Sequence, residues 1–268
     1  MNVVIILAIV VIVVILIVRK IKKAGGPVLP DGTMSVPEST ITIKDGMYRK
    51  MNIKLLFIPE TVENIGDEAF ADNLIGETNI GRNVKSIGTR AFVANRLKSI
   101  LIPASVKHIG DGAFAKNQLE TVIGGFTSVE TIGMGAFAEN NISSELSIGL
   151  IDSHEVKTIG AGAFKKNNLT EVGVNAISIG PLAFAENPLE RITIFEKVKE
   201  IGDGAFESNS IEEILVFGTN INMSGMMFFK GHDFAAFYNS HGKCPGKYTL
   251  DESGWKLEKF EEAENHVG

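Results

Sequence analysis

A nine-residue sequence motif recurs, with variations, seven times in this chain and constrains its fold more than any other feature. The clearest copy spans residues 109–117 and reads IGDGAFAKN. The phenylalanines that mark the copies are Phe70, Phe92, Phe114, Phe137, Phe164, Phe184 and Phe206. A period in the low twenties is typical of a solenoid, in which each unit buries its apolar face only against its neighbours. We therefore expect most of the chain to form one elongated repeat domain.

The full repeat is clearest over residues 97–118. Counted from Leu97, apolar residues fall at +3, +5, +9, +12 and +17. Side chains at +3 and +5 of a short strand point the same way, into the core. The Phe at +17 fills the wide corner of the coil, and the Ala before it lets adjacent coils approach. The Gly at +13 indicates either a conformation that a Cβ would oppose or close backbone packing.

With a degenerate copy that starts at Ile211, the leucine-rich repeats are expected to run over residues 53–232 in about eight coils of 20–27 residues. An asparagine follows each marker phenylalanine by three residues. A buried amide is retained only when it is hydrogen-bonded, so we predict a structural ladder of asparagine side chains. Its members are Asn73, Asn95, Asn117, Asn140, Asn167, Asn187 and Asn209.

Three segments precede the repeats. Residues 3–18 are an unbroken apolar run followed by basic residues, close to the roughly 17–20 residues that span a bilayer. We predict a membrane anchor with a basic flank over residues 1–23, in preference to a buried helix or a cleaved secretory signal. The Pro- and Gly-rich residues 24–39 predict a flexible tether. Residues 40–52 alternate β-formers around Asp-Gly, which predicts a β-hairpin that caps the core.

After residue 232 the repeat pattern stops. Residues 233–257 predict a C-terminal cap, made of a short helix and a β-hairpin, because an open solenoid must cover the core of its last coil. Residues 258–268 predict an acidic tail.

Composition and motifs argue against catalysis and against nucleic acid. Four of the 26 basic residues lie in the first 30 positions, which leaves 22 against 32 acidic residues, the wrong balance for binding phosphates. The recurring Gly-x-Gly lacks the third glycine of a dinucleotide fingerprint. The five histidines lack metal-ligand spacing, and the adjacent residues Asp152, Ser153 and His154 cannot converge as a triad. We expect no enzyme activity, no cofactor and no metal.

The strand residues that point outward are the candidates for function. Leu55, Phe57, Leu101 and Ile123 place apolar side chains on the N-terminal half of the sheet, and exposed apolar surface marks interfaces. The coil over residues 142–168 is the longest, and its excess contains Leu150, Ile151 and His154, which we add to the candidate protein-binding residues. The alternatives are an incidental patch and a tolerated loop.

The repeated pattern L-x-x-I-x-I-P-x-x-V-x-x-I-G-x-x-A-F-x-x-N resembles the BspA-like, or Treponema pallidum-type, leucine-rich repeats, in which Cys often stands at the Asn place. The segment over residues 237–255 also looks like the closing segment of spirochaete members. The resemblance covers roughly residues 50–257. It implies a right-handed solenoid that is secreted or surface-exposed, binds host or partner-cell proteins and has no catalytic residues. The predicted fold class is thus a mostly-β α+β solenoid, a right-handed leucine-rich-repeat superhelix.

These observations predict a non-enzymatic protein that mediates adhesion or binds a host or envelope protein. The alternative is a structural envelope component that forms homo-oligomers through the apolar sheet face. For location, the basic residues after the apolar run favour a cytoplasmic repeat domain, whereas the resemblance favours an extracytoplasmic one. We take as the expectation a membrane-anchored protein whose repeats lie in the periplasm or on the cell surface.

Overall fold

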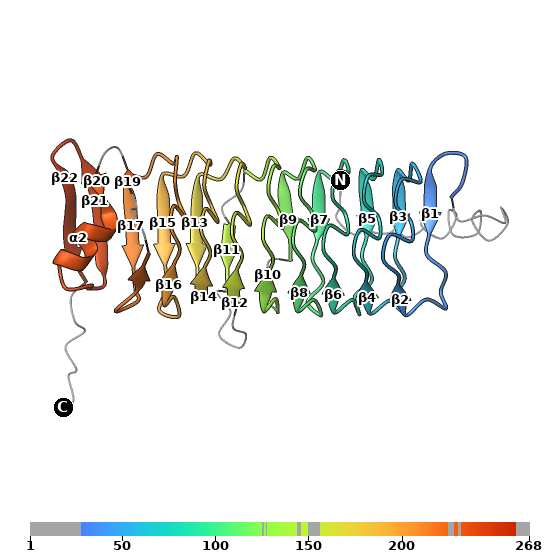
Figure 1. Ribbon diagram of the computed structural model, residues 1–268, viewed down its shortest axis with the longest axis horizontal. Coiled ribbons are helices and arrows are strands. Elements are labelled where there is room, and N and C mark those ends of the chain that lie inside the picture. Colours follow the sequence, from blue (N-terminus) through green and yellow to red (C-terminus); the bar gives the residue numbers. More distant parts are fainter. Residues whose placement is uncertain are drawn as a thin grey trace, which may run out of the picture.

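The computed structural model describes residues 28–124, 126, 128–143, 146–149, 156–224, 228–229 and 232–260. Over these ranges the chain winds into one elongated stack of coils (Figure 1). Nearly all regular structure is short β-strand, and α2 (Phe234–Ser240) is the one helix among the described residues. The mostly-β solenoid of about eight turns that the repeat period predicts is confirmed. Its right-handedness stays a prediction.

Each coil contributes two strands, and like strands of successive coils pair in parallel except at two places among the odd-numbered strands. We call the two surfaces they form the odd-strand face and the even-strand face. The odd-strand face contains β1 (Thr33–Ser35), β3 (Leu55–Phe57), β5 (Glu77–Asn79), β7 (Ser99–Leu101), β9 (Thr121–Ile123), β11 (Leu146–Ile148), β13 (Glu171–Val174), β15 (Arg191–Ile194) and β17 (Glu213–Val216). The even-strand face contains β2 (Thr42–Ile43), β4 (Asn64–Ile65), β6 (Ser86–Ile87), β8 (His108–Ile109), β10 (Thr131–Ile132), β12 (Val156–Ile159), β14 (Ala176–Ile179), β16 (Glu200–Ile201) and β18 (Asn222–Met223).

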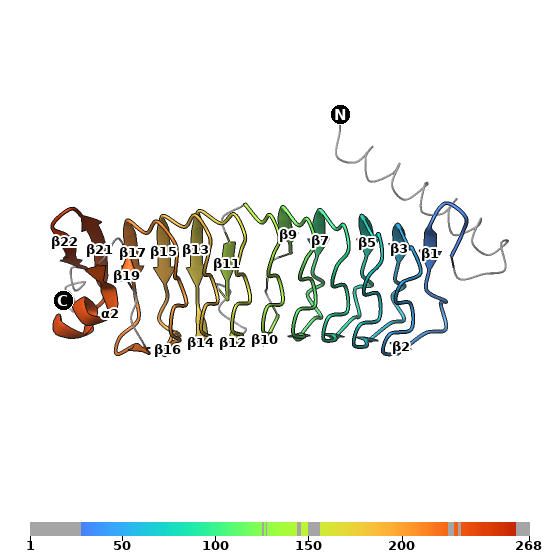
Figure 2. The same cartoon turned by 45° about the horizontal axis from the view of Figure 1, so that its top comes forward.

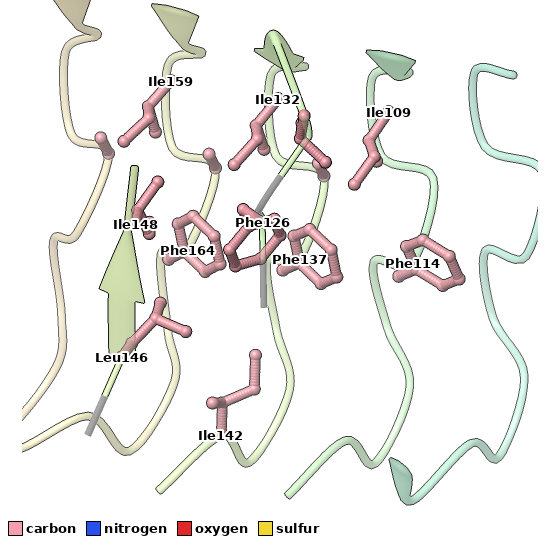
Figure 3. Packing of buried hydrophobic residues seen from close by; sticks show 14 of the residues in the cluster. Ile109, Phe114, Phe126, Ile132, Phe137, Ile142, Leu146, Ile148, Ile159 and Phe164 are labelled. Atoms are coloured by element: carbon pink, nitrogen blue, oxygen red, sulfur yellow. The ribbon is translucent and has the colours of Figure 1, made fainter. Parts of the chain in front are cut away.

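The marker phenylalanines form a continuous column of rings inside the solenoid. All seven are at most 1% exposed, and consecutive rings stack with centroids 5.2–5.4 Å apart. Figure 3 shows Phe114, Phe137 and Phe164 in a row on consecutive coils. Stacked aromatic pairs contribute about 0.5–1.5 kcal/mol beyond the burial of their area. The column is therefore a main source of cohesion between coils.

The glycine after each repeated isoleucine is needed because adjacent coils approach closely there. A Cβ added to Gly110 would lie 2.5 Å from the backbone nitrogen of Thr89 and 2.6 Å from the carbonyl carbon of Gly88. Gly112, two residues later, is different: its φ is +59°, and the nearest atom to an added methyl group would be Arg90 Cγ at 3.4 Å. Gly110 is required because a side chain there would collide with the adjacent coil, whereas Gly112 is favoured because its backbone is left-handed.

We predict that Gly110→Ala destabilises the protein more than Gly112→Ala. The first substitution forces two coils apart, and overpacking costs about 1–3 kcal/mol. The second strains only a left-handed residue, at about 1 kcal/mol, and Arg90 itself adopts this conformation with φ of 55°. Urea denaturation of both variants measures the difference. Equal losses for the two variants would contradict the close-packing role of Gly110.

The odd-strand face is interrupted after β5 and after β9, whereas the even-strand face is one nine-stranded sheet. At the first interruption Thr78 occupies the inward place that holds Leu56 and Ile100 in neighbouring coils. Its buried Oγ1 has no hydrogen-bond partner among the described residues. An unpaired buried hydroxyl costs about 1–3 kcal/mol.

Thr78→Val is therefore predicted to raise the free energy of unfolding by about 1 kcal/mol. Valine keeps the shape of threonine and removes the unpaired hydroxyl. Thr131→Val is the control, because the Thr131 hydroxyl lies 2.9 Å from His108 Nδ1 and already has a partner. Thermal melting of both variants measures the effect, and a gain for Thr131→Val equal to that for Thr78→Val would refute the explanation.

At the second interruption, after β9, the residues that fill the core differ from those of the other coils. Gly124 stands at the +5 place, where neighbouring coils have Ile80 and Ile102. Phe126 fills the core instead: it is 2% exposed and meets the rings of Phe137 and Phe164 edge-on at 5.6 and 5.8 Å (Figure 3). Figure 1 shows β9 and β11 wider apart than neighbouring odd strands elsewhere.

The segment before the first predicted repeat is a further coil and not a tether followed by a hairpin. β1 pairs in parallel with β3, and β2 pairs in parallel with β4. Tyr48 takes the place of the marker phenylalanine and stacks on Phe70 at 5.4 Å. The hairpin prediction over residues 40–52 is wrong. So is the tether prediction over residues 28–39, while residues 24–27 lie outside the described ranges.

The physical reason lies in the Asp-Gly pair that suggested a hairpin turn. Asp45 Oδ1 accepts the backbone N–H of Asp67 at 2.8 Å, as Asp67 Oδ1 does from Thr89 in the next coil at 2.7 Å. Gly46 has a φ of +59°, and the residues at the equivalent place in later coils are left-handed too. The Asp-Gly signal thus belongs to the corner of a coil, and stacking on the next coil determines the backbone.

The predicted membrane-anchored location is also corrected. Across the part of the chain that the structure describes, no helix is long and apolar enough to cross a membrane; α2 has 7 residues. Residues 1–23, on which that prediction rested, lie outside the described ranges. The single N-terminal span, and the location inferred from it, are therefore not supported.

Antiparallel strands end the stack at the C-terminal end of the solenoid (Figure 2). β21 (Gly246–Asp251) pairs antiparallel with β17, and β22 (Gly254–Lys259) pairs antiparallel with β21. The short strands β19 (Phe228–Phe229) and β20 (His232–Asp233) precede α2. Asp233 begins the helix by accepting the backbone N–H of Ala236 at 3.2 Å. Phe234, Tyr238, Tyr248 and Trp255 are buried together against the last coil.

Candidate protein-binding surface

The repeated asparagines join consecutive coils and are not available to a ligand. Asn117 is representative: its Oδ1 accepts the N–H of Leu97 at 3.1 Å, and its Nδ2 donates to the carbonyls of Phe92 at 2.9 Å and Phe114 at 3.0 Å. Equivalent bonds are made by Asn73, Asn95, Asn140, Asn167, Asn187 and Asn209. These side chains form a ladder that satisfies buried backbone groups, which is a structural role.

The structure places Leu101 and Ile123 side by side on the odd-strand face. They are paired residues of the neighbouring strands β7 and β9, and their exposed fractions are 53% and 52%. Alternation along each strand explains this, because the intervening Ile100 points inward and is 2% exposed. We call these two residues the Leu101–Ile123 pair.

The other two strand candidates lie apart from this pair. Leu55 and Phe57, on β3, are each partly buried. Phe57 has Asn79 as its paired neighbour on the side toward Leu101, and Ser35 on the other side. The predicted apolar stripe is thus interrupted by a polar residue. Leu150, Ile151 and His154 lie outside the described residues.

A hollow beside Leu101 is a feature that the repeat pattern alone did not reveal. It has a volume of about 510 Å³ and lies at the carboxyl ends of β5, β7 and β9. We call it the Gly124 hollow; it is lined by Ile80, Arg82, Asn83, Leu101, Ile102, Pro103, Ala104, Ser105 and Gly124. The signal that could have found it is the glycine at a +5 place that is aliphatic in the neighbouring coils.

The even-strand face is polar, and its side chains pair with one another. Lys157 Nζ donates to Glu130 at 2.9 Å, and this hydrogen bond lowers the pKa of the Glu130 carboxyl. Lys85 and Glu63 pair in the same way at 2.8 Å. A protein partner that covered these paired polar side chains would bury little apolar surface and would gain little binding energy from it. The odd-strand face is the better candidate surface.

Among the described residues, no group of three or more His, Cys, Asp and Glu side chains could hold a metal ion. The glycines of the Gly-x-Gly motif serve coil geometry, as Gly110 and Gly112 show. Cys244, the sole cysteine of the chain, is a partly buried free thiol.

The repeat pattern and the coil geometry agree with comparison to known families. The model of the BspA type leucine rich repeat region matches residues 32–143 and 126–235. The chain belongs to the BspA-type leucine-rich-repeat family. Proteins with these repeats and this fold are typically not enzymes. The family prediction is confirmed at this level, while the Treponema pallidum type and the spirochaete relationship stay predictions.

Several solved structures are similar to this chain. A leucine-rich repeat protein from Bacteroides ovatus matches with a TM-score of 0.57 and 20% identity, over 75% of this chain and 61% of that one. The pneumococcal vaccine antigen PcpA matches with a TM-score of 0.43 and 19% identity, over 70% and 56%. A leucine rich cell surface protein from Faecalibacterium prausnitzii matches with a TM-score of 0.41 and 17% identity, over 87% and 58%.

The likeness to the Bacteroides ovatus structure shows the leucine-rich-repeat fold alone, because its identity is low. This chain spans 56–61% of the length of these three proteins. No curated protein matches the chain.

Proposed function

We propose that this BspA-type protein is a non-enzymatic binding protein that holds another protein against the Leu101–Ile123 pair. The observation that carries the proposal is the exposure of two aliphatic side chains, each about half exposed, on adjacent strands of a regular scaffold. Exposed apolar groups on a rigid sheet can be desolvated without ordering the backbone, and a few such residues supply most of the binding energy of an interface.

The neighbouring outward positions support this choice. Asn79 on β5, Gly173 on β13 and Thr193 on β15 occupy the same place in their coils as Leu101, and none carries a bulky apolar group. Leu215 does, but it is only partly exposed. Adhesion to a host or partner-cell protein is the form of binding that we propose, from the resemblance of the repeats to BspA-like proteins.

The double variant Leu101→Ser and Ile123→Ser is predicted to lose partner binding while keeping its melting temperature. Each substitution removes an exposed aliphatic contact, so together they should weaken binding at least about 10-fold, the equivalent of 1.4 kcal/mol. The full chain is immobilised, proteins that it retains are identified and purified, and their affinities for wild type and variant are measured.

Leu215→Ser is the matched control, because it makes the same change at the same place of a C-terminal coil. It should leave the affinity unchanged. Equal binding by wild type and the double variant would refute the assignment of the surface, and so would equal losses in the double variant and the control.

Self-association through the same pair is the second candidate, since a half-exposed aliphatic pair can also meet a second copy of itself. Sedimentation velocity over a range of concentrations separates the two candidates. A monomer at all concentrations removes self-association, whereas a dimer that the double variant abolishes would assign the pair to contact between copies.

A further inference from the structure

The Gly124 hollow has an apolar floor that is preformed. Ile80 and Ile102, at its base, are 5% and 2% exposed, and Pro103 and Ala104 continue the apolar lining. A volume of about 510 Å³ lies within the range of pockets that hold small ligands, about 300–1,000 Å³, and is large enough for one bulky side chain. The hollow adjoins Leu101 and can receive a group from a partner that lies across the strand.

Gly124 keeps this hollow open. Its φ is +83°, and a Cβ added to it would lie 2.8 Å from the carbonyl oxygen of Ile102 and 3.3 Å from Leu101 Cδ1. Any larger residue would strain the backbone and fill the space. Because the isoleucines at its base are already buried, the hollow is part of the folded scaffold, and binding there needs little ordering of the protein.

One wall of the hollow carries a positive group. Arg82 Nε pairs with Glu60 at 2.8 Å, and the Arg82 side chain is 81% exposed. Its terminal amino groups have no other partner within the described part of the chain. Arg82 lines the hollow and Glu60 does not. A carboxylate entering from this side would meet guanidinium donors, which bind carboxylates in a bidentate manner.

We propose that the Gly124 hollow takes one bulky apolar side chain from an extended segment of the partner protein, with an acidic residue of that segment at Arg82. The same segment lies across the Leu101–Ile123 pair. This inference rests on the proposed function and specifies its partner: a peptide segment in which a bulky aliphatic or aromatic residue is followed or preceded closely by Asp or Glu.

A random-peptide display library selected against the immobilised full chain tests the proposal. Enriched peptides should share a bulky apolar residue next to an acidic one. A synthetic copy of an enriched peptide is then titrated against four variants: Leu101→Ser, Ala104→Phe, Arg82→Ala and the control Leu215→Ser. Ala104 is exposed at the rim of the hollow, so its replacement by Phe fills the hollow without disturbing the core.

The expected result is a loss of about 10-fold or more in affinity for Leu101→Ser and Ala104→Phe. Arg82→Ala should weaken the affinity a few-fold and reduce the dependence of binding on salt, as expected for an exposed charge pair. Leu215→Ser should bind as wild type does, and circular dichroism should show all four variants folded.

Three results would overturn the inference: no enrichment, enriched peptides without the apolar–acidic pattern, or unchanged binding to Ala104→Phe. The proposed function is tested separately by the purified partner. If that partner loses affinity for the double variant but binds Ala104→Phe as tightly as wild type, the hollow is excluded and the Leu101–Ile123 surface is supported. If its affinity is unchanged by both the double variant and Ala104→Phe, the surface is excluded as well.

Discussion

Replacing Phe137 by alanine is expected to lower the free energy of unfolding by about 3–5 kcal/mol, the usual cost of truncating a buried phenylalanine. Phe137 is fully buried, and its ring stacks between Phe114 and Phe164 at 5.2 Å on each side. It also meets the edge of Phe126 at 5.6 Å. The truncation therefore weakens two coil interfaces and one core contact together.

Urea denaturation followed by circular dichroism measures this loss. In a solenoid, stability is close to a sum of unit and interface terms, so a defect at the central coil should also lower the cooperativity of unfolding. Phe217→Ala is the control, because Phe217 also stacks on neighbouring rings but is 37% exposed. A loss for Phe137→Ala no larger than the loss for Phe217→Ala would contradict the structural role of the ring column.

Asn117→Ala is expected to cost about 2–4 kcal/mol, because it leaves one buried backbone N–H without a partner, at about 1–3 kcal/mol, and removes two further hydrogen bonds. The N–H of Leu97 loses its partner. The carbonyls of Phe92 and Phe114 each lose one of two amide donors and keep the other, from Asn95 and Asn140 respectively. Thermal or urea unfolding measures the loss. Asn83→Ala is the control, since Asn83 donates one exposed hydrogen bond, to the Glu60 carbonyl. Comparable losses for the two variants would refute the ladder.

Asn117→Asp separates the accepting and donating roles of the amide. An aspartate can still accept from Leu97, but when ionised it faces the carbonyls of Phe92 and Phe114 without a proton to donate. Burial and these carbonyls would raise its pKa in the folded state above the ordinary value of about 4. Its stability should therefore be highest below that value and fall as the pH rises through it and up to the folded pKa. Stability independent of pH, relative to wild type, would contradict this geometry.

Much of the fold could be predicted because the same inward positions recur in every coil. The coils on either side contain counterparts of Ile109, Ala113 and Phe114. A contact between two coils is therefore repeated by the equivalent residues of the next pair of coils. The repeated Asn could be assigned a backbone-pairing role on the same basis, since a buried amide at a fixed place in each coil requires a fixed set of partners.

The first coil could not be recognised from the sequence. It keeps the spacing of the repeat but has different residue types at the repeated places. Tyr48 replaces Phe, and Met51 stands where later coils have Asn, so the motif is not recognisable there. The local Asp45-Gly46 signal then favours a hairpin. Stacking of Tyr48 on Phe70 and parallel pairing of β2 with β4 override that local preference.

The candidate site was only partly predictable. Alternation along a strand places Leu101 and Ile123 outward, and their side-by-side position follows from the register of the coils. The Gly124 hollow was missed. The glycine at the +5 place signals a local change of the core, but the space beside Leu101 depends on how three coils are placed relative to one another. The separation of Phe57 from the pair by Asn79 required the three-dimensional arrangement.

The most direct test of the proposed binding surface is hydrogen exchange of the full chain with and without a partner protein that it retains. Slower exchange is expected over β7, β9 and the loop over residues 102–105, where the Leu101–Ile123 pair and the Gly124 hollow lie. Exchange over β13, β15 and β17 should not change. Protection confined to those C-terminal strands, or to the even-strand face, would contradict the assignment.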